Sequence, residues 1–246
     1  MSSDKRTAYI VSHTHWDREW YLPYHRFRVA LVRVVDQVLD ALENDESFRH
    51  FLLDGQCVVL EDYLEVRPEA RERVEALVRA GALSLGPWYV LPDEFLVSGE
   101  ATVRNLLVGH AVAGEFGPVQ KVGYMPDSFG HIAQMPQLLR RAGIDSFVYT
   151  RGNGDELDTL GLEYTWSAPD GSEVLAVNQW GGYCNAAALG LAELWHAFTR
   201  RDVCRGRAVD KVGKLLEEVG KRSNCGVLLL NNGCDHHPPQ KEFGPI

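Results

Sequence analysis

The segment Ala8-Tyr-Ile-Val-Ser-His-Thr-His-Trp-Asp-Arg-Glu-Trp20 joins a short apolar run to a cluster of polar and aromatic side chains. The apolar run, Ala8 to Ser12, has the length and composition of a buried β-strand. His15 and Asp17 follow this strand, and alternate side chains of an extended chain point to the same side. A buried strand followed by a polar segment is the unit that recurs along this chain, and it decides the expected fold class.

Short apolar runs alternate with longer segments of helical period along the whole chain. The predicted strands are Ala8 to Ser12, Phe51 to Leu53, Leu83 to Leu85, Val122 to Met125, Ser146 to Tyr149, Val174 to Asn178 and Val227 to Leu230. The predicted helices are Val29 to Leu42, Val58 to Ala80, Ala101 to Val112, Met135 to Ala142 and Leu191 to Lys221. No linker-like tract divides the chain, so this order predicts one α/β domain with a parallel sheet, either closed as a barrel or open and doubly wound.

Polar, aromatic or charged residues follow each predicted strand. After the segment quoted above, they are Asp54-Gly-Gln56, Gly86-Pro-Trp-Tyr89 with Pro92-Asp-Glu94, Pro126-Asp-Ser-Phe-Gly-His131, Thr150-Arg151, Asn178-Gln-Trp180 and Asn231-Asn-Gly-Cys-Asp-His-His237. In parallel α/β folds the carboxyl ends of the strands form one shared rim, so these distant groups are expected to converge. We therefore expect the functional site on this rim.

His15 and Asp17 are candidate metal ligands, because imidazole nitrogen and carboxylate oxygen suit zinc and its neighbours. Structural histidines and N-cap aspartates produce the same spacing, so His15 and Asp17 alone do not decide between the two readings. Asp127 and His131 favour the metal reading, since they bring a second carboxylate and a second imidazole to the same rim.

The other candidates also have structural alternatives. Asp127 fits an ordinary helix cap, and Asp235 fits a solvated turn before two prolines. Arg151 fits a surface charge, but a guanidinium beside several acids favours a role in orienting a carboxylate or a ligand hydroxyl. Any one tryptophan fits core packing. Four of the six lie on the expected rim, where aromatic faces can stack on sugar rings: Trp16, Trp20, Trp88 and Trp180.

Composition excludes several classes of function. The chain has 246 residues, is 45% hydrophobic and carries a formal net charge of −9, which is typical of a folded protein. The negative charge argues against binding to nucleic acid or to anionic membrane surfaces. The apolar run near the N-terminus is too short for a signal peptide or a membrane span.

The five cysteines are scattered and odd in number, with no Cys-x-x-Cys pair. This pattern predicts free thiols, mostly buried as small apolar residues, and no disulfide framework. We therefore expect a reducing, cytoplasmic location.

Taken together, three motifs resemble those of the glycoside hydrolase family 38 α-mannosidases. They are His13-Thr-His-Trp-Asp-Arg-Glu-Trp20, Gly123-Tyr-Met-Pro-Asp-Ser-Phe-Gly-His131 and Asn232-Gly-Cys-Asp-His-His-Pro-Pro-Gln240. They occur in the family's order along essentially the whole chain. Leu53-Asp-Gly-Gln56 and Gly86-Pro-Trp-Tyr89 are most similar to the bacterial branch, which includes mannosylglycerate hydrolases.

The resemblance implies a zinc-dependent retaining α-mannosidase whose residues 1–246 form the N-terminal catalytic domain, a seven-stranded parallel (β/α)7 barrel. By position, His15, Asp17 and Asp127 correspond to zinc ligands, and Asp127 also corresponds to the nucleophile. Asp235 corresponds to the general acid/base. The residues expected at the substrate are Trp20, Arg151, Trp88, His131 and His236. The implied substrate is an α-mannoside, from an oligosaccharide or a small mannoside such as mannosylglycerate.

The chain also departs from the family pattern. Family members continue into a helical bundle and β-sandwich domains, so we interpret the chain as truncated after the barrel. The family's fourth zinc ligand, a histidine from the later region, has no counterpart, although His236 or His237 could substitute. A homo-oligomer or a separate C-terminal half could cover the exposed surface. Two alternatives to an active mannosidase stay open: a metal- or sugar-binding fragment without turnover, and a metal-dependent carbohydrate deacetylase.

Overall fold

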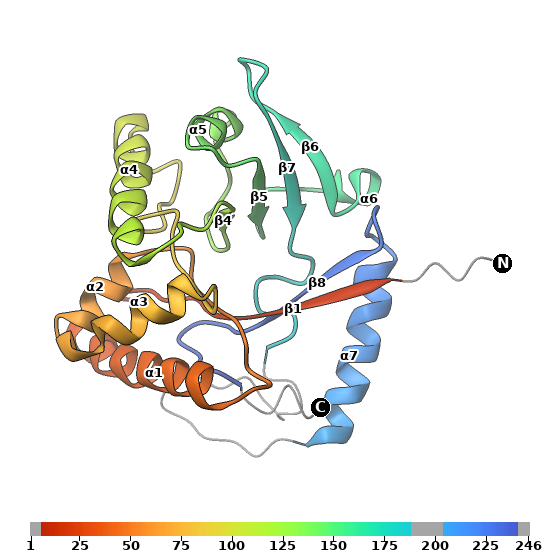
Figure 1. Cartoon of the computed structure of the whole chain (residues 1–246). Helices are drawn as coiled ribbons and strands as arrows, with labels where there is room; N and C mark the ends of the chain where they lie inside the picture. Colours follow the sequence, from red (N-terminus) through yellow and green to blue (C-terminus); the bar gives the residue numbers. More distant parts are fainter. Residues whose placement is uncertain (1–5, 188–203, 241–246) are drawn as a thin grey trace.

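The strands form two four-stranded sheets in the computed structural model, which describes residues 6–187 and 204–240 (Figure 1). The strands are β1 (Thr7–Thr14), β2 (Phe51–Leu53), β3 (Leu83–Ser84), β4 (Gly123–Met125), β5 (Ser146–Tyr149), β6 (Glu163–Ser167), β7 (Glu173–Asn178) and β8 (Val227–Asn232). The first sheet has the order β3-β2-β1-β8, and the second has the order β4-β5-β7-β6.

The first sheet is parallel throughout, and β1 lies between β2 and β8. β1 pairs with β8 from Thr7, opposite Val227, to Ser12, opposite Asn232. Past the strand ends an isolated bridge joins His15 to Asp235. The register therefore brings two candidate site residues, far apart in the sequence, to the same rim.

The second sheet contains a strand that the sequence analysis missed. β6 and β7 form an antiparallel hairpin, with Glu163 opposite Val177 and Ser167 opposite Glu173. Gly171 at the turn has a φ of 83°, which glycine adopts without steric cost. Asp-Gly between two strand-forming runs is a hairpin signal, so the sequence did contain the information.

The closed seven-stranded parallel barrel is not found among the described residues. They form eight strands in two separate sheets, and one of those strands is antiparallel. β3 and β4, the strands that would have to meet on one side, are only two and three residues long. On the other side, a side chain that follows β7 bonds to β8: Nε2 of Gln179 donates to Asn231 Oδ1 at 3.0 Å.

Helices cover the outer faces, with α1 (Tyr24–Asn44), α2 (Val58–Leu64) and α3 (Arg71–Arg79) grouped together and α7 (Arg205–Gly220) beside β8 (Figure 1). Every third or fourth residue of α1 is buried, from Phe27 to Leu39, as an amphipathic helix requires. The helix predicted over Val58 to Ala80 is broken at Pro68. The helices are α1 (Tyr24–Asn44), α2 (Val58–Leu64), a 3₁₀ turn (Pro68–Ala70), α3 (Arg71–Arg79), α4 (Gly99–Phe116), α5 (Met135–Arg141), α6 (Leu157–Leu160) and α7 (Arg205–Gly220).

Helix α7 accounts for part of the helix predicted over Leu191 to Lys221, and positions 188–203 lie outside the described residues. None of the helices in the described ranges is long and apolar enough to cross a bilayer.

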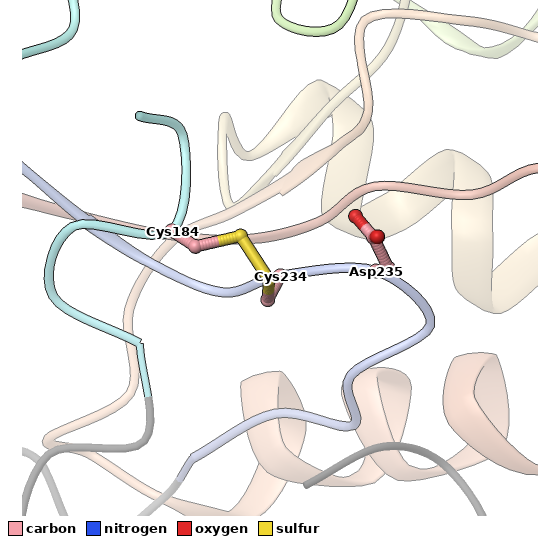
Figure 2. A group of neighbouring side chains, drawn as sticks. All are labelled: Cys184, Cys234 and Asp235. Atoms are coloured by element: carbon pink, nitrogen blue, oxygen red, sulfur yellow. A yellow bond between two sulfur atoms is a disulfide. The ribbon is translucent and has the colours of Figure 1, made fainter. Parts of the chain in front are cut away.

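The expectation of free thiols is wrong for one pair of cysteines. Cys184 and Cys234, 50 residues apart in the sequence, form a disulfide between the loops that follow β7 and β8 (Figure 2). Cys57 is free and buried as expected, whereas Cys204 and Cys225 are free and exposed. The spacing of the cysteines gave no sign of the pair because the fold, and not the sequence distance, brings these two loops together.

Candidate active site

His15 lies just past the end of β1 and is only 5% exposed. Its Nδ1–H donates to Asp54 Oδ1 at 3.0 Å. An ionised carboxylate can only accept, so this bond places the proton of a neutral His15 on Nδ1 and leaves the lone pair of Nε2 free. Nε2 is therefore the atom that can bind a metal ion.

Asp54 is fully buried after β2 and is held by several donors. Besides His15, the backbone N–H of Trp16 and Nε2 of Gln56 donate to its Oδ2 at 2.7 and 2.6 Å. Gln56 Nε2 also donates to the carbonyl of Trp16 at 2.9 Å. The residues after β1 and β2 are thus tied together beneath the site.

The free Nε2 of His15 faces two carboxylates. It lies 3.6 Å from Asp17 Oδ1 and 3.9 Å from Asp127 Oδ2. Two ligand atoms each about 2.1 Å from one zinc ion can be up to roughly 4.2 Å apart, so each carboxylate is within the distance at which it could share a cation with His15. One imidazole with two carboxylates is a donor set that zinc accepts, so the three residues fit such an ion by their chemistry.

Charges in this cluster act on one another. Burial lowers the pKa of His15, but the carboxylates of Asp54 and Asp17 outweigh it, and the net pKa lies well above the usual value. Burial opposes ionisation of Asp17, but the neighbouring His15 brings the net pKa of Asp17 below its usual value. The metal-free site therefore favours a positive imidazole between carboxylates, and a cation bound there would replace that proton.

A second group of ligand-type atoms lies nearby. The Sγ atoms of Cys184 and Cys234 and a carboxylate oxygen of Asp235 lie within 4.8 Å of one another (Figure 2). The two sulfurs are bonded to each other in the disulfide. They are not thiolates in this state, so this group does not offer the ligands that a metal ion needs.

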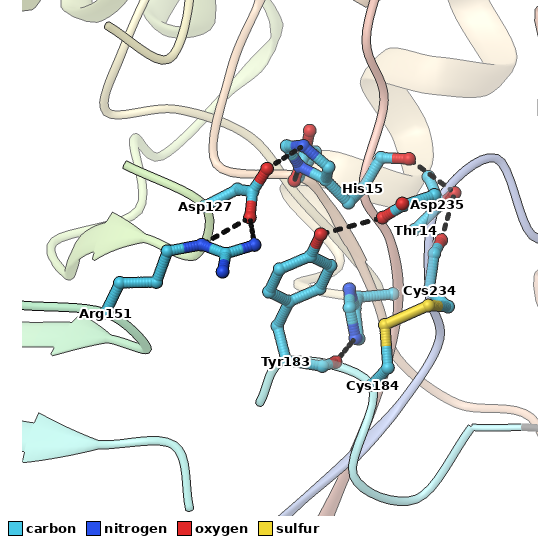
Figure 3. Close-up of a disulfide and its surroundings, with 10 residues drawn as sticks. Thr14, His15, Asp127, Arg151, Tyr183, Cys184, Cys234 and Asp235 are labelled. Carbon is cyan, nitrogen blue, oxygen red and sulfur yellow. Dashed lines mark hydrogen bonds and ion pairs between the residues drawn. A yellow bond between two sulfur atoms is a disulfide. The ribbon is translucent and has the colours of Figure 1, made fainter. Parts of the chain in front are cut away.

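Asp127 lies between His15 and Arg151 (Figure 3). The Nε–H of Arg151 donates to Asp127 Oδ1 at 2.9 Å, and a second guanidinium nitrogen contacts the same oxygen. The guanidinium also lies 4.6 Å from the centre of the Phe129 ring. Asp127 raises the pKa of Arg151 above its usual value, so this guanidinium is a fixed positive charge beside the carboxylate.

The loop that carries Asp127 is held by hydrogen bonds to Glu94, which is only 2% exposed. Glu94 Oε2 accepts from the backbone N–H of Ile132 at 2.8 Å, and Oε1 lies 2.6 Å from His131 Nδ1. His131 Nε2 donates to the carbonyl of Arg151 at 2.8 Å. Both ring nitrogens of His131 are thus engaged within the protein, and the side chain links the loops of Asp127 and Arg151.

Asp235 lies on the opposite side of His15 and is paired with Tyr183 (Figure 3). Tyr183 Oη donates to Asp235 Oδ1 at 2.8 Å, and its ring centre lies 5.2 Å from that of His15. Burial and the negative charges of Asp235 and Asp127 raise the pKa of Tyr183, so it stays protonated and able to donate.

His236 has no exposed surface and does not reach the pocket. Its Nε2 accepts from the backbone N–H of Asp17 at 3.3 Å, and its Nδ1 lies 3.2 Å from the hydroxyl of Tyr21. The ring packs edge-on against Trp16 and near Phe27. Burial lowers the pKa of His236, so a neutral ring supports Asp17 from behind.

The two tryptophans expected at the substrate lie in opposite environments. Trp20 is 72% exposed, whereas Trp88 is fully buried and forms a backbone bridge with Gln56. A pocket of about 320 Å³ opens over the cluster, a size suited to a small sugar. Its lining includes His15, Asp17, Arg18, Glu19, Gln56, Asp93, Asp127 and Phe129.

Three residues of the site were not identified from the sequence: Asp54, Glu94 and Tyr183. Asp54 and Glu94 stand in the polar segments after predicted strands, but nothing marked them as buried carboxylates. Buried carboxylates require partners, and those partners became visible only with the fold. Tyr183 follows a Gly-Gly pair with no motif around it.

Similarity to known proteins shows the family to which the chain belongs. The family described as "Glycosyl hydrolases family 38 N-terminal domain" matches residues 5–244, and the chain belongs to this family. The "Putative mannosylglycerate hydrolase" of Halalkalibacterium halodurans is 39% identical, over 97% of this chain and 26% of that protein.

Two further relatives are described as α-mannosidases. The crystal structure of an alpha-mannosidase from Enterococcus faecalis V583 superposes with a TM-score of 0.86 at 38% identity, over 97% of this chain and 26% of that one. Alpha-mannosidase G of Dictyostelium discoideum is 27% identical, over 71% of this chain and 16% of that protein. The chain thus spans about a quarter of the length of the first of these relatives and of the solved structure.

Proposed function

We propose that this chain carries the catalytic site of a zinc-dependent α-mannosidase that retains the configuration of the sugar. One observation carries the proposal: His15 Nε2, with its proton held on the other ring nitrogen by Asp54, faces the carboxylates of Asp17 and Asp127 in a sugar-sized pocket. Membership in glycosyl hydrolase family 38 supports it.

His15, Asp17 and Asp127 would hold the zinc ion. Zinc, when bound, supplies a positive charge that orients sugar hydroxyls and favours distortion of the ring toward the transition state. Asp54 fixes the tautomer and the orientation of His15, as a carboxylate behind a ligating histidine does. His236 supports Asp17 through the backbone N–H of that residue.

Asp127 would act as the nucleophile and Asp235 as the acid/base. In a retaining glycosidase one carboxylate attacks the anomeric carbon, while the other group protonates the leaving oxygen and then removes a proton from water. Arg151 fixes Oδ1 of Asp127, which directs the reactive carboxylate toward His15 and the pocket. Tyr183 fixes Oδ1 of Asp235 in the same way.

The proposed substrate is a terminal α-linked mannose, in an oligosaccharide or in a small mannoside such as mannosylglycerate. The name of the H. halodurans relative supports the small mannoside, and the names of the other two relatives support α-mannose in general. The exposed Trp20 and Phe129, at 72% and 66%, offer aromatic faces for the sugar or its aglycone.

The test is hydrolysis of an aryl α-mannoside by the purified chain, with its zinc content measured. We expect zinc-dependent release of mannose, first as the α-anomer. Asp127→Asn should lower kcat by on the order of 10³-fold, as loss of a nucleophile does. Asp155→Asn, at an exposed loop carboxylate, is the matched control and should leave the rate unchanged.

A folded, zinc-loaded chain that releases no mannose would overturn the proposal for this chain. It would then be a domain that binds a metal ion or a sugar without turnover. First release of the β-anomer would overturn the retaining mechanism and leave the glycosidase assignment intact.

A further inference from the structure

We propose that Cys184 and Cys234 are a reversible thiol–disulfide site that sets the position of Tyr183 against Asp235 and thereby the activity of the mannosidase site. The proposal rests on the acid/base role proposed above for Asp235. It assigns a function to two cysteines that take no part in the proposed hydrolysis itself.

The disulfide joins the two residues that are next in sequence to the hydrogen-bonded pair Tyr183 and Asp235. Cys184 directly follows Tyr183, and Cys234 directly precedes Asp235. Their Cα atoms are 4.8 Å apart, and Tyr183 Oη donates to Asp235 Oδ1 at 2.8 Å (Figure 3). The covalent bond and the hydrogen bond therefore join the same two loops at adjacent positions.

Besides Asp235, Tyr183 contacts three residues of the site, and one of them, Arg151, interacts with its side chain. The Tyr183 carbonyl accepts from His13 Nε2 at 2.8 Å, and the Tyr183 ring packs against His15. Reduction would separate the sulfurs and allow the Cys184 backbone to move with Tyr183, while backbone hydrogen bonds to His15 keep Cys234 and Asp235 in place. The carboxyl group of Asp235 would then lose the hydrogen bond that fixes its Oδ1. A carboxyl group that must meet the leaving oxygen is sensitive to such a loss, because displacements of about 1 Å can cost about 10²-fold in rate.

The loop stays attached to β8 when the disulfide is open. The backbone N–H of Ala186 donates to the carbonyl of Asn231 at 3.0 Å, and Asn185 Oδ1 accepts from the backbone N–H of Asn231 at 2.7 Å. These bonds involve no cysteine. Reduction should therefore loosen the Tyr183 end of the loop without unfolding the domain, which is what a reversible control needs.

The chemistry is thiol–disulfide exchange with a small disulfide such as glutathione disulfide. Cys184 is partly exposed while Cys234 is 9% exposed, so Cys184 is the more accessible residue of the pair and is assigned the first attack. Its thiolate attacks the small disulfide, forming a mixed disulfide and releasing one small thiol. Cys234 then displaces the second thiol, so the two cysteines lose two electrons and two protons in total.

The experiment sets the redox state and measures both chemistry and activity. The zinc-loaded full chain is equilibrated with glutathione disulfide or with a phosphine reductant, which avoids a thiol that would bind zinc. Differential alkylation and mass spectrometry then report the state of each cysteine. We expect kcat/KM for an aryl α-mannoside to be about 10-fold lower in the reduced protein, as a positional effect predicts.

Variants separate the cause from general effects of oxidation. Cys184→Ser with Cys234→Ser should match the reduced protein under both conditions. Cys204→Ser with Cys225→Ser, which removes the two exposed cysteines outside the site, should keep the full redox response. Tyr183→Phe cannot donate to Asp235, so its activity should become nearly independent of redox state.

Equal kcat/KM in the two states of the wild-type chain would overturn the proposal, as would thiols at Cys184 and Cys234 that resist glutathione disulfide. Hydrogen exchange of residues 179–187 gives a readout independent of catalysis and should be faster after reduction. If neither state hydrolyses the mannoside, the proposed function fails for this chain. Unchanged exchange would then overturn the redox proposal, and faster exchange would support it.

Discussion

Asp54 Oδ1 lies 3.0 Å from Nδ1 of His15, on the side of the ring opposite the two candidate metal-binding carboxylates. Asp54 is fully buried, and its backbone φ is 51°, in the left-handed region. Nearly all of its hydrogen-bonding capacity is used by residues that follow β1 and β2. Its role is therefore to hold His15 with the correct nitrogen toward the pocket.

Asp54→Asn should weaken zinc binding by about 10- to 100-fold, as loss of the group behind a ligating histidine does. Asparagine tolerates the left-handed backbone well, so the variant tests the charge and not the turn. Zinc affinity is measured by competition with a chromophoric chelator. Asp36→Asn is the matched control, because Asp36 bonds Tyr63 and Arg67 outside the site. An equal loss of affinity in both variants would contradict the assigned role.

Zinc removal should destabilise the domain through the same cluster. A ligand that binds only the folded state at 100 times its Kd adds about 2.7 kcal/mol to the free energy of unfolding. Thermal unfolding with zinc and with a chelator should therefore differ clearly in Tm. His15→Ala should lose this difference, whereas His50→Ala, at an exposed position, should keep it. A zinc effect that survives in His15→Ala would place the bound metal elsewhere.

Gly233 allows β8 and β1 to approach closely beside the site. A Cβ at this position would lie 2.0 Å from the carbonyl oxygen of His13, a backbone atom that cannot turn away. Gly233→Ala should lower the free energy of unfolding by about 2 kcal/mol or more, as overpacking and backbone displacement do. Gly213→Ala is the control, because nothing lies within 4 Å of that Cβ. It should raise stability by about 0.5–1 kcal/mol in helix α7. Urea unfolding of both variants decides the matter, and equal midpoints would argue against the close approach.

Much of the secondary structure followed from local sequence. β2 and β5 begin and end at the predicted residues, since short apolar runs bounded by polar segments mark buried strands well. The way the strands assemble did not follow. Two short strands, β3 and β4, and the hairpin of β6 and β7 replace the closed parallel barrel, and such differences depend on pairing across the molecule.

The candidate site was predictable where a residue type carried its own chemistry. His15, Asp17, Asp127 and Arg151 were expected on one rim, and they lie in contact there. Residues that position other side chains through hydrogen bonds were not predictable. The role of Asp54, Glu94 or Tyr183 depends on a partner that only the fold brings close. The disulfide of Cys184 and Cys234 was not predicted from the sequence for the same reason.

The three free cysteines should differ widely in their rates of alkylation, because their exposure and their thiol pKa values differ. The backbone N–H of Arg207 lowers the pKa of Cys204, which is exposed at the start of α7. Burial raises the pKa of Cys57 to about 12. Iodoacetamide reacts with the thiolate, and each pKa unit changes the thiolate fraction about tenfold below the pKa.

At pH 7.5 we expect Cys204 to be alkylated first and Cys57 to stay unlabelled in the folded protein. Time-resolved mass spectrometry of tryptic peptides measures the order, and labelling after unfolding gives the upper limit for each site. Cys204→Ser should remove the fast phase and leave the slower labelling of Cys225 in place. If Cys57 is labelled as fast as Cys204, its packing beneath Gly109, whose carbonyl accepts its thiol at 3.4 Å, is not maintained in solution.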